Sequence, residues 1–117
     1  MPQPSLRVIV NNIFTEVSGI FGVVIFHRNG LIVDVAGVEE ETGIQITASI
    51  NRLRELEKLV GSKLVGIDLV FEKHVAVIRV GDKVGVAILA EPGQEMELLD
   101  HLAFRVIDEV EKDFLGF

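Results

Sequence analysis

Apolar residues recur at helical spacing in three segments, and each segment predicts an amphipathic helix. The helices are expected over residues 6–17, over residues 42–60, and from residue 94 or 95 to about residue 114. On the second helix, Thr47, Asn51 and Arg54 fall opposite the apolar face. The three apolar faces consist, in order, of Leu6, Ile9, Val10, Ile13, Phe14 and Val17; of Ile46, Ile50, Leu53, Leu56 and Val60; and of Met96, Leu99, Ala103, Val106, Val110 and Phe114.

Five shorter apolar runs predict β-strands over residues 21–27, 31–35, 63–71, 75–80 and 84–90. The first two runs flank Arg28-Asn29-Gly30, and Asn-Gly between apolar runs is a strong hairpin signal, because both central residues of the favoured turn take positive φ. The last three runs follow one another after short gaps, so successive antiparallel hairpins are expected rather than crossovers.

The polarity of the runs indicates which strands lie inside the sheet. Residues 21–27 and 84–90 are apolar on both faces, so each strand needs cover above and below and should be central. Asp34, Asp68 and Arg79 place charge in the other three strands, which should lie nearer the edges. The prediction is an α/β (α+β) three-layer domain spanning residues 1–117, with element order α-β-β-α-β-β-β-α and helices on both faces of the sheet.

Composition excludes several classes of function. The chain has no cysteine, so disulfide and thiolate chemistry are excluded. A net charge of −7 and the lack of Trp and Tyr argue against binding to nucleic acid, which needs clustered cations and stacking platforms. Residues 1–5 show no secretory pattern, and no apolar run approaches the roughly 20 residues of a membrane span. A cytoplasmic protein is therefore expected.

Residues that could carry chemistry are few and scattered. His27, His74 and His101 are far apart in sequence and lack the spacing of metal ligands. Residues 39–41 are three consecutive glutamates, which before a helix are more often a solvated flank than a pair of catalytic carboxylates. Gly19-x-x-Gly22 precedes a strand and is followed by no Gly-Lys-Ser or Gly-Lys-Thr, so it is not a P-loop. No catalytic, metal-binding or cofactor-binding residue is predicted, and a hydrolase using Asp34 with the glutamates is the weakest reading.

One phrase of the sequence resembles a known family. It runs from the first helix into Gly19-Ile20-Phe21-Gly22, through an apolar strand to His27-Arg28-Asn29-Gly30, and into a second apolar strand. Together with the element order, this phrase resembles the roadblock/dynein light chain family, with Gly19, Gly22, Asn29 and Gly30 as motif residues. The resemblance implies a five-stranded antiparallel sheet in the order 2-1-5-4-3 and a homodimer formed by the second helix and the third strand. Family members are regulators or scaffolds of Ras-like small GTPases, or dynein light chains, and bring no catalytic residues.

The residues themselves also favour self-association. Ile44, Ala48 and Leu59 extend the apolar arc of the second helix beyond one sheet contact, and an edge strand as apolar as residues 65–71 is an aggregation hazard unless it is covered. The alternative is that this excess buries in the chain's own core. The predicted interface comprises Ile44, Ile46, Ala48, Ile50, Leu53, Leu56, Leu59, Val65, Ile67 and Leu69.

Two hypotheses for function follow. The leading one is a non-catalytic dimeric scaffold or regulator that binds a Ras-like small GTPase or a related switch or motor protein. The alternative is a small-molecule-binding sensory domain of the profilin-like fold, which would need a pocket with convergent polar groups. Phe104, off the main stripe of the third helix, is expected to widen its buried face rather than contact a partner, and Leu115 and Phe117 either pack down or dock elsewhere.

Overall fold

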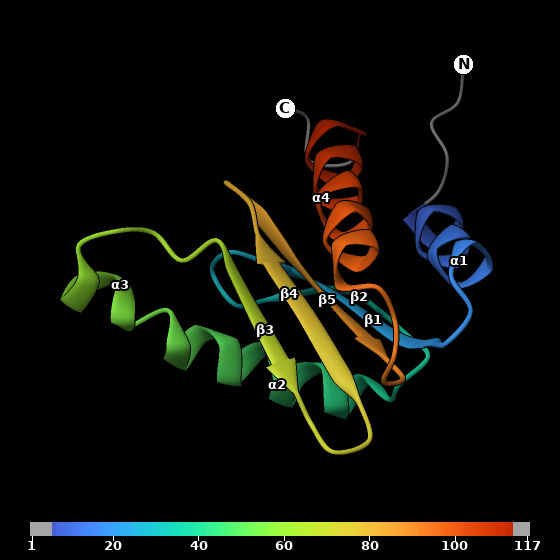
Figure 1. The fold of residues 1–117 in the computed structure, drawn as a ribbon. Coiled ribbons are helices and arrows are strands. Elements are labelled where there is room, and N and C mark those ends of the chain that lie inside the picture. Colours follow the sequence, from blue (N-terminus) through green and yellow to red (C-terminus); the bar gives the residue numbers. More distant parts are fainter. Residues whose placement is uncertain (1–5, 114–117) are drawn as a thin grey trace.

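A computed structural model describes residues 6–113 of the chain (Figure 1). Its helices are α1 (Leu6–Glu16), α2 (Glu40–Leu53), α3 (Leu56–Val60) and α4 (Met96–Asp113). Its strands are β1 (Ile20–His27), β2 (Ile32–Ala36), β3 (Gly66–Val70), β4 (Val75–Val80) and β5 (Val84–Ala90). None of the helices described is long and apolar enough to cross a membrane.

The strands form one antiparallel sheet in the order β2-β1-β5-β4-β3, which confirms the expected order. β1 and β5 lie at its centre, where Val23 pairs with Ile88 and Val24 with Ala87. All four side chains are fully buried, as expected for strands that are apolar on both faces and covered on both. β2 and β3 are the two edges.

Helices cover both faces of the sheet, and each face has its own core layer. α4 packs on β4 and β5 and α1 packs beside it on β1 and β2, whereas α2 packs on the opposite face over β1 and β2 (Figure 1). The layer under α1 and α4 includes Ile13, Ile25, Val77 and Leu99. The layer under α2 is smaller and is built around Val24, Phe26, Ile50, Ile78, Val80 and Ala87. The three-layer prediction is confirmed.

The β1–β2 hairpin is present, but its turn is not the two-residue type that was expected. The His27 N–H donates to the Leu31 carbonyl at 2.7 Å, and the Gly30 N–H donates to the His27 carbonyl at 2.9 Å. Gly30 has a φ of 102°, whereas Asn29 has a negative φ and accepts a hydrogen bond from the Leu31 N–H instead. This is a three-residue loop with glycine in its last position, so only Gly30 needs conformational freedom.

The prediction of a single helix over residues 42–60 is wrong in detail, because the structure has two helices there, α2 and α3. Arg54 and Glu55 separate the two, and from Glu55 to Lys58 the backbone switches to bonds between residues three apart, such as Glu57 N–H to Arg54 carbonyl at 3.0 Å. This tighter winding marks the end of the regular α-helix. α3 projects away from the sheet at the far end of α2 (Figure 1).

The face that α2 buries also differs from the predicted one. Thr47, assigned to the polar side, is 1% exposed, and its hydroxyl donates to the Gly43 carbonyl at 2.9 Å. A Cβ at Gly43 would meet a Val35 methyl at 2.6 Å, so glycine allows α2 to approach β2 closely. The small residues at positions 43 and 47 therefore form the contact line with the sheet, and the internal hydrogen bond removes the cost of burying the hydroxyl.

Candidate interaction surface

Large apolar side chains lie exposed along α2, α3 and β3. The most exposed are Leu59 at 83%, Val70 at 79% and Val60 at 74%. Surface hydrophobic residues scattered singly are normal, but a large group of them on neighbouring elements marks an interaction surface. We call this group the α2–β3 surface, and its members are Ile44, Leu53, Leu56, Leu59, Val60, Val65 and Phe71. Val70 shares the other face of β3 with Asp68 and is not a member.

The surface exists because α2 covers only part of its face of the sheet. α2 packs over β1 and β2, so between α2 and the β3–β4 hairpin there is a hollow of about 260 Å³. Ile67 and Leu69, on β3, remain half-buried beside it. The hollow is lined by Gln45, Ile46, Ser49, Ile50, Leu53, Leu69, Phe71 and Ile78.

This hollow does not resemble a site for a polar small molecule. Its polar side chains are Gln45 and Ser49, and each is bonded within α2: Gln45 to Glu41 and Ser49 to the Gln45 carbonyl. Ligand pockets place several polar groups so that they converge on the ligand. The shape and lining suit apolar side chains supplied from outside.

The structure divides the predicted interface residues into three groups. Ile44, Ala48, Leu53, Leu56, Leu59 and Val65 are exposed, and Ile46, Ile67 and Leu69 are half-buried. Ile50 is 2% exposed and packs in the core layer under α2, although it also lines the hollow, so its contacts lie mainly within its own chain. Its position at the centre of the sheet-facing side of α2, three residues after Thr47, explains the difference.

A cluster of charged residues fixes the position of α3, and sequence analysis did not find it. The Glu57 carboxylate accepts hydrogen bonds from the Leu64 N–H at 2.6 Å and from Arg28 at 3.0 Å. Arg28 also donates to the Gly81 carbonyl at 2.8 Å, and Arg54 donates to the Arg28 carbonyl. We call Arg28, Arg54 and Glu57 the Glu57 cluster. It ties α3 to the β1–β2 and β4–β5 turns and so holds the end of the α2–β3 surface in place.

A second set of charges lies on the opposite face, beside α4. Arg79 of β4 donates to Asp100 at 2.5 Å and to Asp68 of β3 at 2.8 Å. Burial lowers the pKa of Arg79, but the hydrogen bonds to the two carboxylates outweigh it, so the pKa is raised overall and the guanidinium stays charged. Phe104 lies next to this group and is 44% exposed, so the expectation that it widens the buried face of α4 is wrong. Leu115 and Phe117 lie outside the described residues.

The glycines of the sequence motif have structural roles. Gly19 has a φ of 94° after α1, and its backbone leads directly into β1. A Cβ at Gly22 would lie 2.9 Å from Val38 and 3.0 Å from Leu89, so glycine is required there by close packing. Together with Gly30 and Asn29 in the turn, these residues shape the β1–β2 hairpin.

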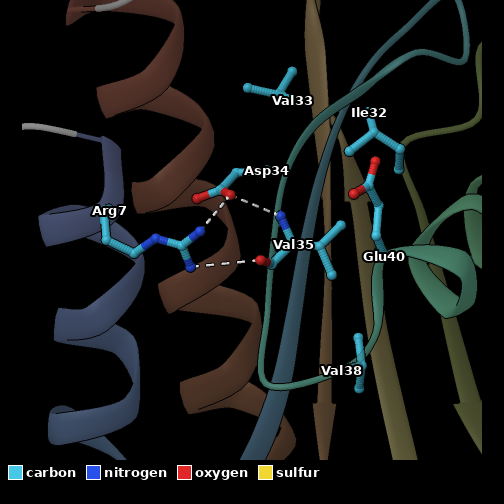
Figure 2. A pocket seen from close by; sticks show the side chains of 7 residues that line it. All are labelled: Arg7, Ile32, Val33, Asp34, Val35, Val38 and Glu40. Atoms are coloured by element: carbon cyan, nitrogen blue, oxygen red, sulfur yellow. Dashed lines mark hydrogen bonds and ion pairs between the residues drawn. The ribbon is translucent and has the colours of Figure 1, made fainter.

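The titratable residues considered earlier do not gather at one place. His27 ends β1, His101 is exposed on α4, and His74 lies edge-on to Phe21 with ring centres 5.0 Å apart. The Asp34 carboxylate is held by Arg7 and the Val35 N–H, while Glu40 begins α2 (Figure 2). Within residues 6–113 no group of three or more metal-ligating side chains is found.

Comparison with known structures identifies the fold. A roadblock/LC7 domain from Streptomyces avermitilis superposes with a TM-score of 0.82 at 14% sequence identity, covering 97% of this chain and 100% of that one. MglB from Myxococcus xanthus gives 0.79 at 15% identity, covering 96% of each chain. A structure described as MglB with tetrameric arrangement gives 0.75 at 8% identity, covering 92% of this chain and 85% of that one.

Comparison of sequences alone finds no such likeness: no protein-family model matches the chain, and no curated protein matches it. The chain has the roadblock/LC7 fold, which confirms the resemblance read from the sequence. At these identities the likeness establishes the architecture and nothing about binding.

Proposed function

We propose that the chain is a non-catalytic, cytoplasmic, dimeric scaffold or regulator that binds a Ras-like small GTPase or a related switch protein. The observation that carries this proposal is the α2–β3 surface. A folded chain of this size normally buries its large apolar side chains, yet Leu59, Val60 and Phe71 are each at least 56% exposed. A second copy of the chain would cover them.

The geometry of the sheet favours the same arrangement. β3 is an edge strand, and in the described part of the chain no side chain hydrogen-bonds to the backbone of Gly66–Val70. Two copies could join at β3 to extend the sheet, and each α2 would then fill the uncovered area beside the other. The tetrameric MglB structure has the same fold and associates with itself, which supports an assembly here. The GTPase partner is inferred from the family resemblance.

Sedimentation of two matched variants tests the dimer. Ile44 on α2 and Leu98 on α4 are 43% and 42% exposed, but only Ile44 belongs to the α2–β3 surface. Ile44→Arg should convert a dimer to a monomer at micromolar concentration, whereas Leu98→Arg should leave the mass unchanged. A wild-type chain that is monomeric at these concentrations contradicts the proposal.

The partner is tested by affinity isolation from the cell extract of the source organism. The extract is loaded with GDP in one sample and with a non-hydrolysable GTP analogue in the other, and captured proteins are identified by mass spectrometry. We expect a small GTPase in one of the two samples, with less of it captured by Ile44→Arg. Recovery of no GTPase in either sample would count against this part of the proposal while leaving the dimer intact.

A further inference from the structure

β2, the other edge of the sheet, is closed by side chains. The Asp34 carboxylate accepts hydrogen bonds from the Val35 N–H at 2.9 Å and from Arg7 of α1 at 2.9 Å. A second nitrogen of Arg7 reaches the Val35 carbonyl at 3.4 Å, a longer contact (Figure 2). We call Arg7 and Asp34 the β2 clasp. Both backbone polar groups of Val35 are thereby occupied.

These are the groups that another strand would use. In an antiparallel pair, alternate residues direct their N–H and C=O groups toward the neighbouring strand and away from it. Because the Val35 groups bond to the clasp, they face away from β1, toward the open side of the edge. A strand added to β2 would have to displace Arg7 and Asp34 first.

Apart from the clasp, this edge has room for an added strand. A hollow of about 350 Å³ lies along it, lined by Arg7, Ile32, Val33, Asp34, Val35, Val38 and Glu40. Arg7 enters it from α1, and Val38 and Glu40 lie on its other side (Figure 2). Ile32, Val33 and Val35 are half-buried, so a second strand would bury more of their apolar surface.

The clasp contributes little to the fold itself. The Arg7 side chain is 54% exposed and the Asp34 side chain 16%, and an ion pair with one partner so open to solvent adds little to stability. Asp34 is a charged residue on an edge strand, a feature that discourages pairing between sheets. The β3 edge also carries a charged residue, Asp68, but its carboxylate bonds to Arg79, and among the described residues no side chain bonds to the backbone of Gly66–Val70. Val65, Val70 and Phe71 beside this edge are exposed.

We propose that the β2 clasp closes this edge against the β2 strand of a second copy, so that the chain associates with itself at β3 alone. The role of β3 rests on the proposed function; the closing of β2 does not. Opening the clasp should allow two β2 strands to pair about a twofold axis. Each copy would offer the same outward N–H and C=O of Val35 to the other.

The test compares two double variants that remove the same charges. Arg7→Ala/Asp34→Ala opens the clasp, and Glu16→Ala/Arg105→Ala breaks the ion pair between α1 and α4 without touching a strand edge. Masses are measured by light scattering after size exclusion over a micromolar concentration series, and far-UV circular dichroism reports folding. The clasp variant should reach twice the wild-type mass if the wild type is a monomer, and twice that mass or more if it is a dimer, because a dimer joined at β3 has two β2 edges. The control should match the wild type. Val35→Pro added to the clasp variant removes the outward N–H and should restore the wild-type mass.

The outcomes separate this proposal from the dimer proposal. If the wild type is a dimer and the clasp variant forms a tetramer or a longer assembly of dimers, both stand. If the wild type is a monomer and the variant a dimer, only the clasp proposal stands. A clasp variant with the wild-type mass at every concentration overturns the clasp proposal. A polymer formed by the variant of a monomeric wild type also overturns it, because β2–β2 pairing alone stops at a dimer and a polymer would mean that β2 pairs with β3. Should the double variant fail to fold, Arg7→Ala and Asp34→Asn are used singly. A partial, concentration-dependent rise in mass is then expected, and no rise overturns the proposal.

Discussion

Alanine substitutions at Ile50 and Leu59 should differ strongly in their effect on stability, although both residues fall in one predicted interface. Ile50 is 2% exposed and packs among Val24, Phe26 and Ile78, so Ile50→Ala leaves a cavity and should lower the free energy of unfolding by about 2–5 kcal/mol. Leu59 is 83% exposed in the single chain, so Leu59→Ala should change that free energy by no more than about 0.5 kcal/mol. For a domain of this size the melting temperature changes by roughly 4 °C per kcal/mol. Ile50→Ala should therefore melt about 8–20 °C below the wild type.

Urea denaturation followed by far-UV circular dichroism measures both effects, because the chain has no Trp or Tyr to serve as a fluorescent probe. Each protein is unfolded at a low concentration, where single chains predominate, and at a high one. Ile50→Ala should be destabilised equally at both concentrations. Leu59→Ala should be close to the wild type at the low concentration and less stable than it at the high one, because binding between folded chains adds to stability.

The result that would refute this reasoning is a large loss for Leu59→Ala at the low concentration. Leu59 would then be packed within the single chain, and the α2–β3 surface would not be free. A wild type whose stability is independent of concentration would likewise contradict the dimer.

Three further substitutions test the local packing by the same denaturation assay. Glu57→Ala should cost about 2–4 kcal/mol, because it removes two short hydrogen bonds, to Arg28 and to the Leu64 N–H; a loss below about 1 kcal/mol would mean that the Glu57 cluster does not hold α3. Gly43→Ala places a methyl 2.6 Å from Val35. The cost of overpacking, about 1–3 kcal/mol, should outweigh the gain in helix propensity of about 1 kcal/mol, so the variant should be less stable than the wild type. A more stable variant would show that α2 can move away from β2. Glu111→Ala removes the carboxylate that accepts hydrogen bonds from the Lys83 and Val84 N–H groups at 2.6 and 3.0 Å, and it should lower the free energy of unfolding by about 1–3 kcal/mol. Amide hydrogen exchange at the β4–β5 turn should become faster, and unchanged exchange would contradict this role.

The sequence by itself determined most of the elements and which strands lie at the centre of the sheet. Helical and strand periodicity is a local property, and runs such as residues 84–90, apolar on both faces, can be satisfied only at the centre of a sheet with helices on both sides. The placement of β1 and β5 at the centre and of β2 at an edge followed from this reasoning, and the family resemblance gave the same order. The exposed apolar residues of α2 and β3 were also visible as an excess of hydrophobic positions.

The tertiary structure alone decided which residues of that excess are free. α2 contacts the sheet along Gly43, Thr47 and Ile50, because a close approach to Val35 needs small side chains, and an apolar periodicity does not show such steric fit. The Glu57 cluster joins residues from two separate parts of the chain, and Arg7 lies 27 residues from Asp34. Ion pairs of this kind depend on which surfaces the fold brings together, and the sequence does not show which charged residues will pair.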